Sequence, residues 1–544
     1  MMKKTKLGAA VMAAVVGVSM LAGCGGGDDT ALKNEAAING GPGDLPITQE
    51  KTTLTIFAPQ SNYIEDITTN EFTQWYEEQT NIHVDWQIAS GDLAQSKNVM
   101  LASGNYPDIL LDCGINRSEQ LVYGEQGIFI DLTQLIEENT KYIKELLEER
   151  PEVRSQLVTP QGKIFGLPTI NDVYHSTYNT KMWVYQPWLD KLGIEAPTTT
   201  EEFYQMLKAF KEQDPNGNGI ADEIPMAATK DLGYLGADGF LMNSFVYCNT
   251  DRMMVEDGKI SFVGNTEEYR EGLRYLNRLY SEGLLLADSL IMDRKGLTSL
   301  GENPDVPILG SAPALWFGMF TIAGGDSGRW AEYQAIAPLE GPSGLRQTPK
   351  VKPEYSGENF SITRNCKNTI AAIRWADWFY SMEGSLTSQY GQENVGWERA
   401  TDGQVGLDGN PAIWVATQKF GSLQNSNWSN FGIFNLSEKL RLGMAADESD
   451  ETESILYNVT KELYEPYGVD KSVPELFFNQ EQATEFTELQ TQITSEIQQS
   501  VAAFVSGERS LDTGWDEYIQ RLNDMGLERY VELYQTVYDE NYKN

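Results

Sequence analysis

The stretch that decides the fold opens with Thr53-Leu54-Thr55-Ile56-Phe57-Ala58, a β-rich run that predicts a strand. Helical composition follows over residues 65–79, and residues 82–88 alternate apolar with polar side chains, which is strand periodicity. A second helix is predicted over residues 93–102, and Ile109-Leu110-Leu111 forms a short buried strand. The order strand–helix–strand–helix–strand favours an α/β lobe with a largely parallel sheet.

The carboxyl ends of these strands are the places where a ligand is expected, because open α/β sheets bind ligands there. The loop Pro59-Gln60-Ser61-Asn62 and the segment after Leu111 are therefore candidate walls of a cleft, or else ordinary loops. The chain has 544 residues, of which 41% are hydrophobic, so it can build more than one core. We expect two or more lobes.

The N-terminus has the pattern of an export signal. Three early lysines precede an apolar run over residues 7–21, which is short for a membrane span. Leu21-Ala22-Gly23-Cys24 then resembles the bacterial lipobox, which implies a signal peptide over 1–23 and a lipid on Cys24. Residues 24–51 have the composition of a flexible tether. We expect a protein on the extracellular face of the cell membrane, held there only by its lipid anchor.

Charge and composition exclude several functions. The formal net charge of −38 argues against binding to nucleic acid. Two histidines, His83 and His175, are too few for a multi-histidine metal centre, and no C-x-x-C motif is present. We predict that Cys113, Cys248 and Cys366 are buried free thiols, although a disulfide plus one thiol is the alternative.

A loop rich in oxygen ligands starts at Asp214 and runs Asp-Pro-Asn-Gly-Asn-Gly-Ile-Ala-Asp-Glu. Calcium takes six to eight hard oxygens in a flexible cage, and the start of this loop resembles an EF-hand. It departs from that motif because Pro225 stands where the closing Glu would be, so Asp222 and Glu223 would have to close the site. The alternative is an Asx/Gly turn between elements.

Strong helices follow this first lobe. Thr199-Thr200-Glu201-Glu202 fits a capping box at the start of an apolar helical face. Residues 269–282 predict another helix, and residues 486–504 predict an amphipathic helix of more than five turns.

Several segments resemble the family 1 extracellular solute-binding proteins, in particular the large lipoprotein branch that includes alginate-binding proteins. The matching segments, in family order, are residues 104–108, 188–211 with the loop from Asp214, 275–284, 504–507, 515–522 and 525–526. They are spread over nearly the whole mature chain. The segment Val184-Tyr185-Gln186-Pro187 departs from the family, because a charged stretch is usual before Trp188.

The resemblance implies an α/β fold of two lobes, of the class II periplasmic-binding-protein type, with the ligand cleft between them. We place residues 52–165 with about 305–375 in the N-terminal lobe, and about 166–304 with 376–544 in the C-terminal lobe. It also implies a monomer that delivers a carbohydrate, most simply an oligosaccharide, to the permease of an ABC transporter. A structural Ca²⁺ is implied in the loop, on Asp214, Asn216, Asn218, Ile220, Asp222 and Glu223.

Candidate ligand residues follow from the chemistry of sugars, whose apolar ring faces stack on aromatic rings while amides and carboxylates bind the hydroxyls. The candidates are Asn62, Asp112, Asn171, Trp183, Tyr185, Trp316, Trp330, Trp397 and Glu398. Each Trp is otherwise a core residue, which is the better interpretation of Trp375 and Trp378 because they lie on an apolar helical face.

Other functions remain as alternatives. A glycosidase needs two carboxylates at a defined separation, which composition does not exclude, but no G-x-S-x-G, P-loop or H-E-x-x-H motif is present. A binding lipoprotein for peptides or another non-sugar solute, and a sensory lipoprotein that presents its ligand to a membrane kinase, both fit the same features. The sequence does not name the solute, its length or its linkage.

Overall fold

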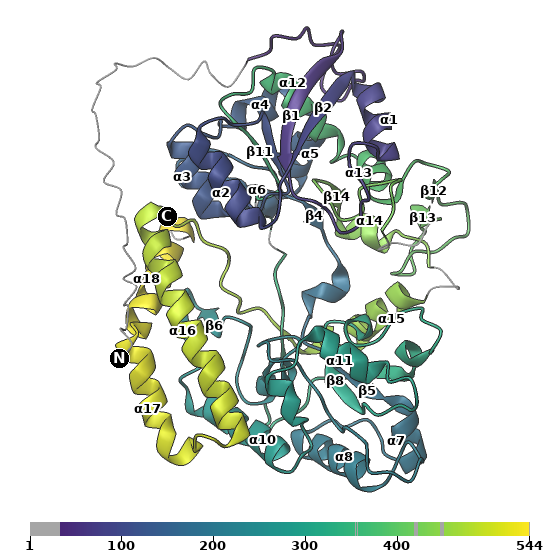
Figure 1. The fold of residues 1–544 in the computed structure, drawn as a ribbon, viewed down its shortest axis with the longest axis vertical. Helices are drawn as coiled ribbons and strands as arrows, with labels where there is room; N and C mark the ends of the chain where they lie inside the picture. Colours follow the sequence, from purple (N-terminus) through teal and green to yellow (C-terminus); the bar gives the residue numbers. More distant parts are fainter. Residues whose placement is uncertain (1–32, 354, 356, 418–422, 447–450, 543–544) are drawn as a thin grey trace, which may run out of the picture.

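The computed structural model describes residues 33–353, 355, 357–417, 423–446 and 451–542. Two lobes lie one above the other in Figure 1 and are joined by chain segments that run between them. Within the described residues, no helix is both long and apolar enough to span a bilayer.

The sheet of the N-terminal lobe has the strand order β11-β3-β1-β2. Its strands are β1 (Thr52–Ala58), β2 (Ile82–Ile88), β3 (Ile109–Leu111) and β11 (Phe360–Ile362). β1 runs parallel to β2 and β3, and β11 is antiparallel to β3. The predicted strand–helix–strand–helix–strand unit is therefore confirmed, with α1 (Glu71–Thr80) and α2 (Leu93–Ser103) as its helices.

The first helix begins later than the sequence predicted. Asn70 caps α1 by accepting from the backbone N–H groups of Phe72 and Thr73, which fixes the start at Glu71. The preceding residues form a turn in which Asp66 accepts from Thr68. A local side-chain turn thus replaces the first predicted helical turns.

Further helices and short strands complete this lobe. They are α3 (Arg117–Glu125), α4 (Thr133–Asn139), α5 (Tyr142–Glu149), α6 (Pro151–Leu157), β4 (Ile170–Asn171), α12 (Thr369–Trp378), α13 (Met382–Tyr390), β12 (Trp397–Arg399), β13 (Trp414–Ala416), β14 (Asn435–Leu436) and α14 (Glu438–Leu442). Their buried side chains form one large core around the sheet and a smaller one around Trp397 and Trp414.

The C-terminal lobe is built on the antiparallel sheet β8-β5-β9, with β5 (Met182–Tyr185), β8 (Ser311–Pro313) and β9 (Tyr333–Ile336). Its helices are α7 (Gln186–Leu192), α8 (Thr200–Glu212), α9 (Ala237–Leu241), α10 (Glu267–Ser281), α11 (Arg294–Gly301), α15 (Thr452–Val459), α16 (Gln480–Ser506), α17 (Leu511–Asp524) and α18 (Leu527–Tyr542). A separate hairpin of β6 (Met253–Glu256) and β7 (Lys259–Phe262) contacts α18. The predicted capping box of α8, the helix α10 and the long α16 are confirmed.

Two of the predicted lobe boundaries are wrong. Residues 305–350 were assigned to the N-terminal lobe, but β8 and β9 pair with β5 and so belong to the C-terminal lobe. Residues 376–446 were assigned to the C-terminal lobe, but Phe379, Trp428 and Phe431 lie in the N-terminal core. Sequence order does not reveal these exchanges, because each depends on pairing between distant segments.

The segments that link the lobes lie side by side. In the first crossing (residues 171–178), the carbonyl of Thr177 accepts from the N–H of Val351 in the second crossing (residues 340–355), at 2.8 Å. The short strands β10 (Thr348–Pro349) and β15 (Gly468–Val469) pair in parallel next to them. The first crossing contains the turn η1 (Tyr174–Thr177), and β15 follows η6 (Thr460–Tyr464) and η7 (Glu465–Tyr467).

The predicted tether over 24–51 is wrong in the part that the structure describes. Ile47 and Thr48 are fully buried, and Asn34 pairs with Asn368 at the start of α12. Arg374 on α12 donates to the carbonyls of residues 39–41. Residues 33–51 therefore pack on the N-terminal lobe. The predicted signal peptide and Cys24 lie outside the described residues.

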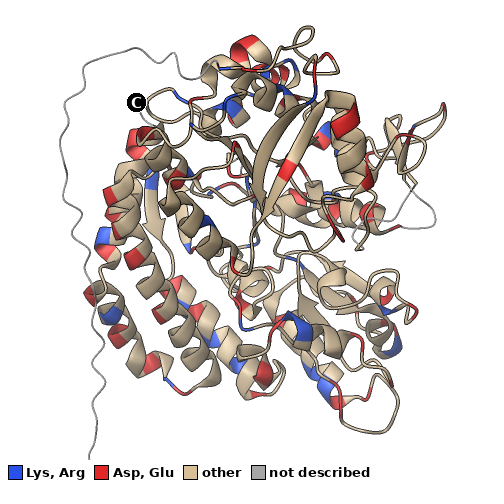
Figure 2. Ribbon diagram, turned by 45° about the horizontal axis from the view of Figure 1, so that its top comes forward, with Lys and Arg blue, Asp and Glu red and all other residues tan. Residues whose placement is uncertain are grey.

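Acidic side chains are spread over the helices of both lobes, with basic ones between them, rather than gathered in one patch (Figure 2). The net charge of −38 is thus a property of the whole surface. Cys113, Cys248 and Cys366 are buried and free, as predicted.

Candidate functional site: the cavity between the lobes

A cavity of 1280 Å³ opens where the crossing segments meet the lobes. Its walls come from α5, α6, both crossings, the α12–α13 corner, the start of α14 and Glu465. Its tyrosine, amide and hydroxyl side chains are Tyr142, Gln156, Asn171, Tyr174, Ser176, Thr177, Tyr178, Tyr355, Tyr380, Ser381, Asn435 and Ser437. Flat rings and hydrogen-bonding groups around one concave space suit a polar solute.

Asp172 is the centre of a buried polar network in this wall. Its carboxylate accepts from Nη1 of Arg150 at 2.7 Å, from the hydroxyl of Tyr355 at 2.7 Å and from the N–H of Glu438 at 3.1 Å. Arg150 also lies over the ring of Tyr355, with 4.8 Å between the guanidinium carbon and the ring centroid. The network therefore joins the start of α6, both crossings and the start of α14.

A second contact joins the first crossing to η7. The hydroxyl of Tyr174 donates to the carboxylate of Glu465 at 2.7 Å, and Lys461 forms an ion pair with the same carboxylate at 2.7 Å. Burial first, and then this carboxylate, raise the pKa of Tyr174, so its hydroxyl stays a donor. The hydrogen bonds from Lys461 and Tyr174 lower the pKa of Glu465. The cavity wall thus keeps a fixed carboxylate next to a tyrosine ring.

Lys181 follows directly after the first crossing and is fully buried. Its Nζ donates to the carbonyl of His175 at 2.6 Å and to the carbonyl of Tyr178, and it lies 5.4 Å from the ring centroid of Tyr464. Burial lowers the pKa of Lys181 to about 7. Burial, and then the charges of Lys181 and Arg441, lower the pKa of His175 to about 3.

Of the nine predicted ligand residues, the structure places only Asn171 in the lining of the cavity. Its Oδ1 accepts from the guanidinium of Arg441, at 2.9 Å from Nε. Asp112 lies at the carboxyl end of β3 with a left-handed φ of 55°, and its carboxylate accepts from Asn359 at 2.8 Å. Burial raises the pKa of Asp112. Asn62 and Glu398 are exposed outside the cavity lining.

The structure contradicts three of the predicted aromatic contacts. Trp183, Tyr185 and Trp397 are 0%, 4% and 0% exposed. Trp183 is held by its indole N–H, which donates to the carbonyl of Ala314, and Tyr185 donates to Glu332. These side chains complete the cores on which the lobes depend. The sequence pattern could not separate them from surface rings.

Trp316 and Trp330 remain partly exposed and form an aromatic group with Phe317. The ring centroids of Trp316 and Phe317 are 5.6 Å apart, and those of Phe317 and Trp330 are 5.4 Å apart. Trp183 packs edge-on against Phe317 from the core side at 5.2 Å. The C-terminal lobe therefore presents two of the predicted tryptophans together on a rigid base.

The loop from Asp214 folds around its own carboxylates. Asp214 accepts from the N–H groups of Gly217 and Gly219, and the amides of Asn216 and Asn218 donate to Asp222 at 2.7 and 2.9 Å. Burial, with the charges of Asp214 and Asp222, raises the pKa of Glu223. Across the described ranges, no three His, Cys, Asp or Glu side chains form a ready metal cluster. The donor set of carboxylates, amide oxygens and one carbonyl nevertheless fits Ca²⁺ chemically.

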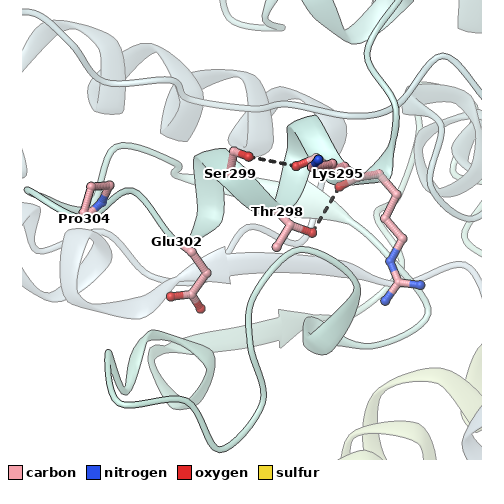
Figure 3. A pocket seen from close by; sticks show the side chains of 6 residues that line it. Lys295, Thr298, Ser299, Glu302 and Pro304 are labelled. Atoms are coloured by element: carbon pink, nitrogen blue, oxygen red, sulfur yellow. Dashed lines mark hydrogen bonds between the residues drawn. The ribbon is translucent and has the colours of Figure 1, made fainter. Parts of the chain in front are cut away.

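Two other depressions are weaker candidates for a binding site. Figure 3 shows a shallow depression along one side of α11, lined by Arg294, Lys295, Thr298, Ser299, Glu302 and Pro304. The hydroxyls of Thr298 and Ser299 donate to backbone carbonyls of α11 itself. A groove of 710 Å³ separates α3 from α16 and α18, and there the buried Arg117 forms an ion pair with Glu475 at 2.9 Å. This groove lies along a direct contact between the lobes.

A family model described as bacterial extracellular solute-binding protein matches residues 59–293, from the loop after β1 to the residue before α11. Over these residues the chain is similar to the bacterial extracellular solute-binding proteins. This is a family of transport proteins rather than of enzymes, and its two-lobe architecture agrees with the fold described above.

Two proteins are similar to this chain over most of its length, and one of them matches both in sequence and in structure. The fructooligosaccharide ABC transporter substrate-binding protein FusA of Streptococcus pneumoniae is 26% identical, over 97% of each chain. The structure of a FusA EF-hand mutant with fructo-nystose matches with a TM-score of 0.74 and 23% identity, over 90% of this chain and 100% of that one. The alginate-binding protein AlgQ2, solved without calcium ion, matches with a TM-score of 0.66 and 21% identity, over 90% and 99%.

Sequence reasoning missed most of the residues that line the cavity. Tyr142 lies on α5, Tyr174 on the first crossing, Tyr355 on the second crossing and Glu465 on η7. No local pattern marks them, because the cavity is assembled from segments more than 300 residues apart. The one signal in the sequence is that Asp172 and Tyr174 lie within three positions of Asn171, which is a predicted ligand residue.

Proposed function

We propose that this protein captures an oligosaccharide outside the cell and delivers it to the permease subunits of an ABC transporter. The observation that carries the proposal is the cavity at the crossings, whose tyrosine rings and hydrogen-bonding groups come from the N-terminal lobe and both crossings, with Glu465 of η7 beside them. The FusA relative, which aligns over nearly the whole chain, is a fructooligosaccharide-binding protein of this kind. Ligand enclosed between the lobes would fix their relative position and so mark the loaded protein for a permease.

The test is calorimetric titration of the chain from residue 25 with fructo-, galacto-, xylo- and malto-oligosaccharides, with di- to pentapeptides and with free amino acids. We expect reversible, stoichiometric binding of an oligosaccharide and no product after long incubation, because the protein is proposed to have no enzymatic activity. Binding of peptides without measurable binding of any sugar would contradict the carbohydrate proposal. Release of shorter sugars would point to a glycosidase instead.

We further propose that Cys24 carries a lipid that anchors the protein to the extracellular face of the membrane after removal of residues 1–23. Replacing Cys24 with Ser is expected to move the protein from the membrane fraction to the medium, which immunoblotting of cell fractions measures. Cys113→Ala is the matched control, since Cys113 is buried and free. A Cys24→Ser protein that stays in the membrane fraction would rule out this anchor.

We propose a structural Ca²⁺ in the loop from Asp214, held by the six predicted ligands Asp214, Asn216, Asn218, Ile220, Asp222 and Glu223. The gathering of Asp214, Asp222 and Glu223 in one loop supports this proposal, and burial, followed by the charges of Asp214 and Asp222, raises the pKa of Glu223. The FusA and AlgQ2 structures concern an EF-hand and a calcium-free form. A bound ion would cross-link the end of α8 to the chain that leads into the C-terminal sheet.

Calcium at about 100 times its dissociation constant should raise the melting temperature by about 2 to 3 °C over that in chelator. Asp214→Ala with Asn218→Ala should abolish this difference, because two of the six ligands are lost. Asp190→Ala, which removes one exposed carboxylate from the neighbouring α7, should leave the difference intact. Equal melting of the wild-type protein with calcium and with chelator would remove the ion from this loop.

A further inference from the structure

We infer that the interlobe cavity selects a neutral oligosaccharide and rejects uronic acids and other anionic sugars. The inference rests on the proposed function and names the ligand class of the same site. Relatives of both kinds exist, since FusA binds fructooligosaccharide and AlgQ2 binds alginate. The choice between these classes therefore has to come from the residues of this chain.

The balance of charge in the lining is negative. It contains seven acidic side chains against four basic ones: Glu145, Glu149, Glu152, Asp172, Glu383, Glu438 and Glu465 against Arg150, Lys350, Lys352 and Lys439. A sugar carboxylate that enters this space meets more like charges than opposite ones, and because most of these carboxylates are exposed, the repulsion should weaken as salt is added. A neutral sugar meets acceptors for its hydroxyl groups.

The arginine of the lining has no open donor pair for a sugar carboxylate. Carboxylates are recognised best by a free guanidinium fork that offers two parallel N–H groups. In Arg150, Nε donates to Glu152 at 2.8 Å, Nη1 to Asp172 at 2.7 Å and Nη2 to Tyr355 at 2.5 Å. The cation is therefore neutralised inside the protein before any ligand arrives.

The neighbouring Arg441, behind Asn171, is committed in the same way. Its Nε and Nη2 both donate to Oδ1 of Asn171, and its Nη1 donates to the hydroxyl of Tyr390. This guanidinium orients an amide that faces the cavity, and the amide is a group that binds sugar hydroxyls.

The lysines of the lining do not supply the missing charge. Lys352 forms an ion pair with Asp470 at 3.2 Å, and the charge of Lys350 acts on Glu465. Lys439 follows Glu438 in the sequence, and the two opposite charges largely offset each other. In contrast, the carboxylates of Glu145, Glu149 and Glu438 have no ion-pair or side-chain hydrogen-bond partner in the described part of the chain. These three groups remain available as acceptors for hydroxyls.

The test compares oligosaccharides of matched length by titration calorimetry at 20 and 150 mM salt. Neutral probes are kestose, nystose, galactotriose, xylotriose and maltotriose, and anionic probes are trigalacturonate, trimannuronate and sialyllactose. We expect the tightest ligand to be neutral, with an affinity that changes less than about twofold between the two salt concentrations. Every anionic probe should bind at least about 100-fold more weakly.

A charge-reversal variant makes the cause testable. Glu145→Lys with Glu149→Lys should improve the binding of anionic probes by about tenfold or more, because two repulsive charges become attractive. Glu148→Lys is the matched control, since Glu148 lies on the same helix but outside the cavity lining. It should leave the weak affinity for anionic probes unchanged. Circular dichroism checks that both proteins are folded.

The outcomes separate this inference from the proposed function. A wild-type protein whose tightest ligand is a uronate or sialylated sugar would overturn the inference and leave sugar capture standing. Retention of peptides without any sugar would overturn the proposed function, and the inference with it. Silence toward every neutral probe would also count against the inference.

Discussion

Replacing Asp172 with alanine is expected to lower the free energy of unfolding by about 3 kcal/mol, because it leaves the charge of Arg150 without its buried partner. Asp172 accepts hydrogen bonds from Arg150, Tyr355 and the backbone of Glu438, so one carboxylate fixes the start of α6, both crossings and the start of α14. The cost lies at the lower end for a buried ion pair, since Glu152 still contacts Arg150 at 2.8 Å.

The same substitution should weaken oligosaccharide binding by about tenfold or more, since the cavity wall loses the group that holds both crossings in place before ligand arrives. Urea unfolding gives the change in stability. Calorimetry gives the affinity, with whichever oligosaccharide binds in the titration proposed above. Asp172→Asn is the graded control, because it keeps the shape and accepts from Tyr355 but carries no charge. A loss of stability below about 1 kcal/mol for Asp172→Ala would contradict the role of this network.

Tyr355→Phe tests one arm of the network separately. It removes the hydroxyl that accepts from Arg150 and donates to Asp172, while the ring under Arg150 remains. The expected loss is about 2 kcal/mol, because two hydrogen bonds disappear and each has a usual net value of about 1 kcal/mol. If Tyr355→Phe costs as much as Asp172→Ala, the carboxylate is not the centre of the network.

The part of the fold that sequence predicted is the part in which neighbours in sequence are neighbours in space. β1, α1, β2, α2 and β3 follow one another in sequence, and β1 pairs with both β2 and β3, so periodicity and breaker residues locate these elements. The capping box at Thr199 also depends only on residues three positions apart. Such local patterns can be recognised without knowledge of the rest of the chain.

Local sequence patterns cannot predict which segments exchange between the lobes. β11 joins β3 and β8 joins β5, across more than 100 residues in each case, and no local pattern selects these partners. Aromatic residues raise the same difficulty at the site. Trp183 and Trp316 both have apolar residues on either side, but pairing in the sheet buries the first, whereas the second stands past the end of β8. Their exposure is decided by tertiary contacts.

The buried Lys181 should make stability depend on pH in a way that its replacement removes. Its amine donates to two carbonyls, which are those of His175 and Tyr178, and no carboxylate forms an ion pair with it in the described residues. A neutral amine has two N–H groups, so both are satisfied in that form. The charged form lacks a counterion there, and burial lowers the pKa of Lys181 to about 7.

Between the folded pKa of about 7 and the unfolded pKa of about 10.4, the unfolded chain binds more protons at Lys181 than the folded protein does. Stability from this group therefore rises with pH in that window, by about 2 kcal/mol from pH 7 to pH 9. Lys181→Met lacks this gain, so its stability relative to the wild-type protein should fall by that amount over the same interval.

Urea unfolding of both proteins at pH 7, 8 and 9 measures this difference. His175, whose pKa is lowered to about 3, is neutral in the folded protein throughout and does not obscure it. Lys208→Met, which removes an exposed lysine from α8, serves as the control for loss of one positive charge. Parallel pH profiles for the wild-type and Lys181→Met proteins would mean that Lys181 stays charged when folded. In that case the ring of Tyr464, 5.4 Å away, would have to stabilise the cation next to the first crossing.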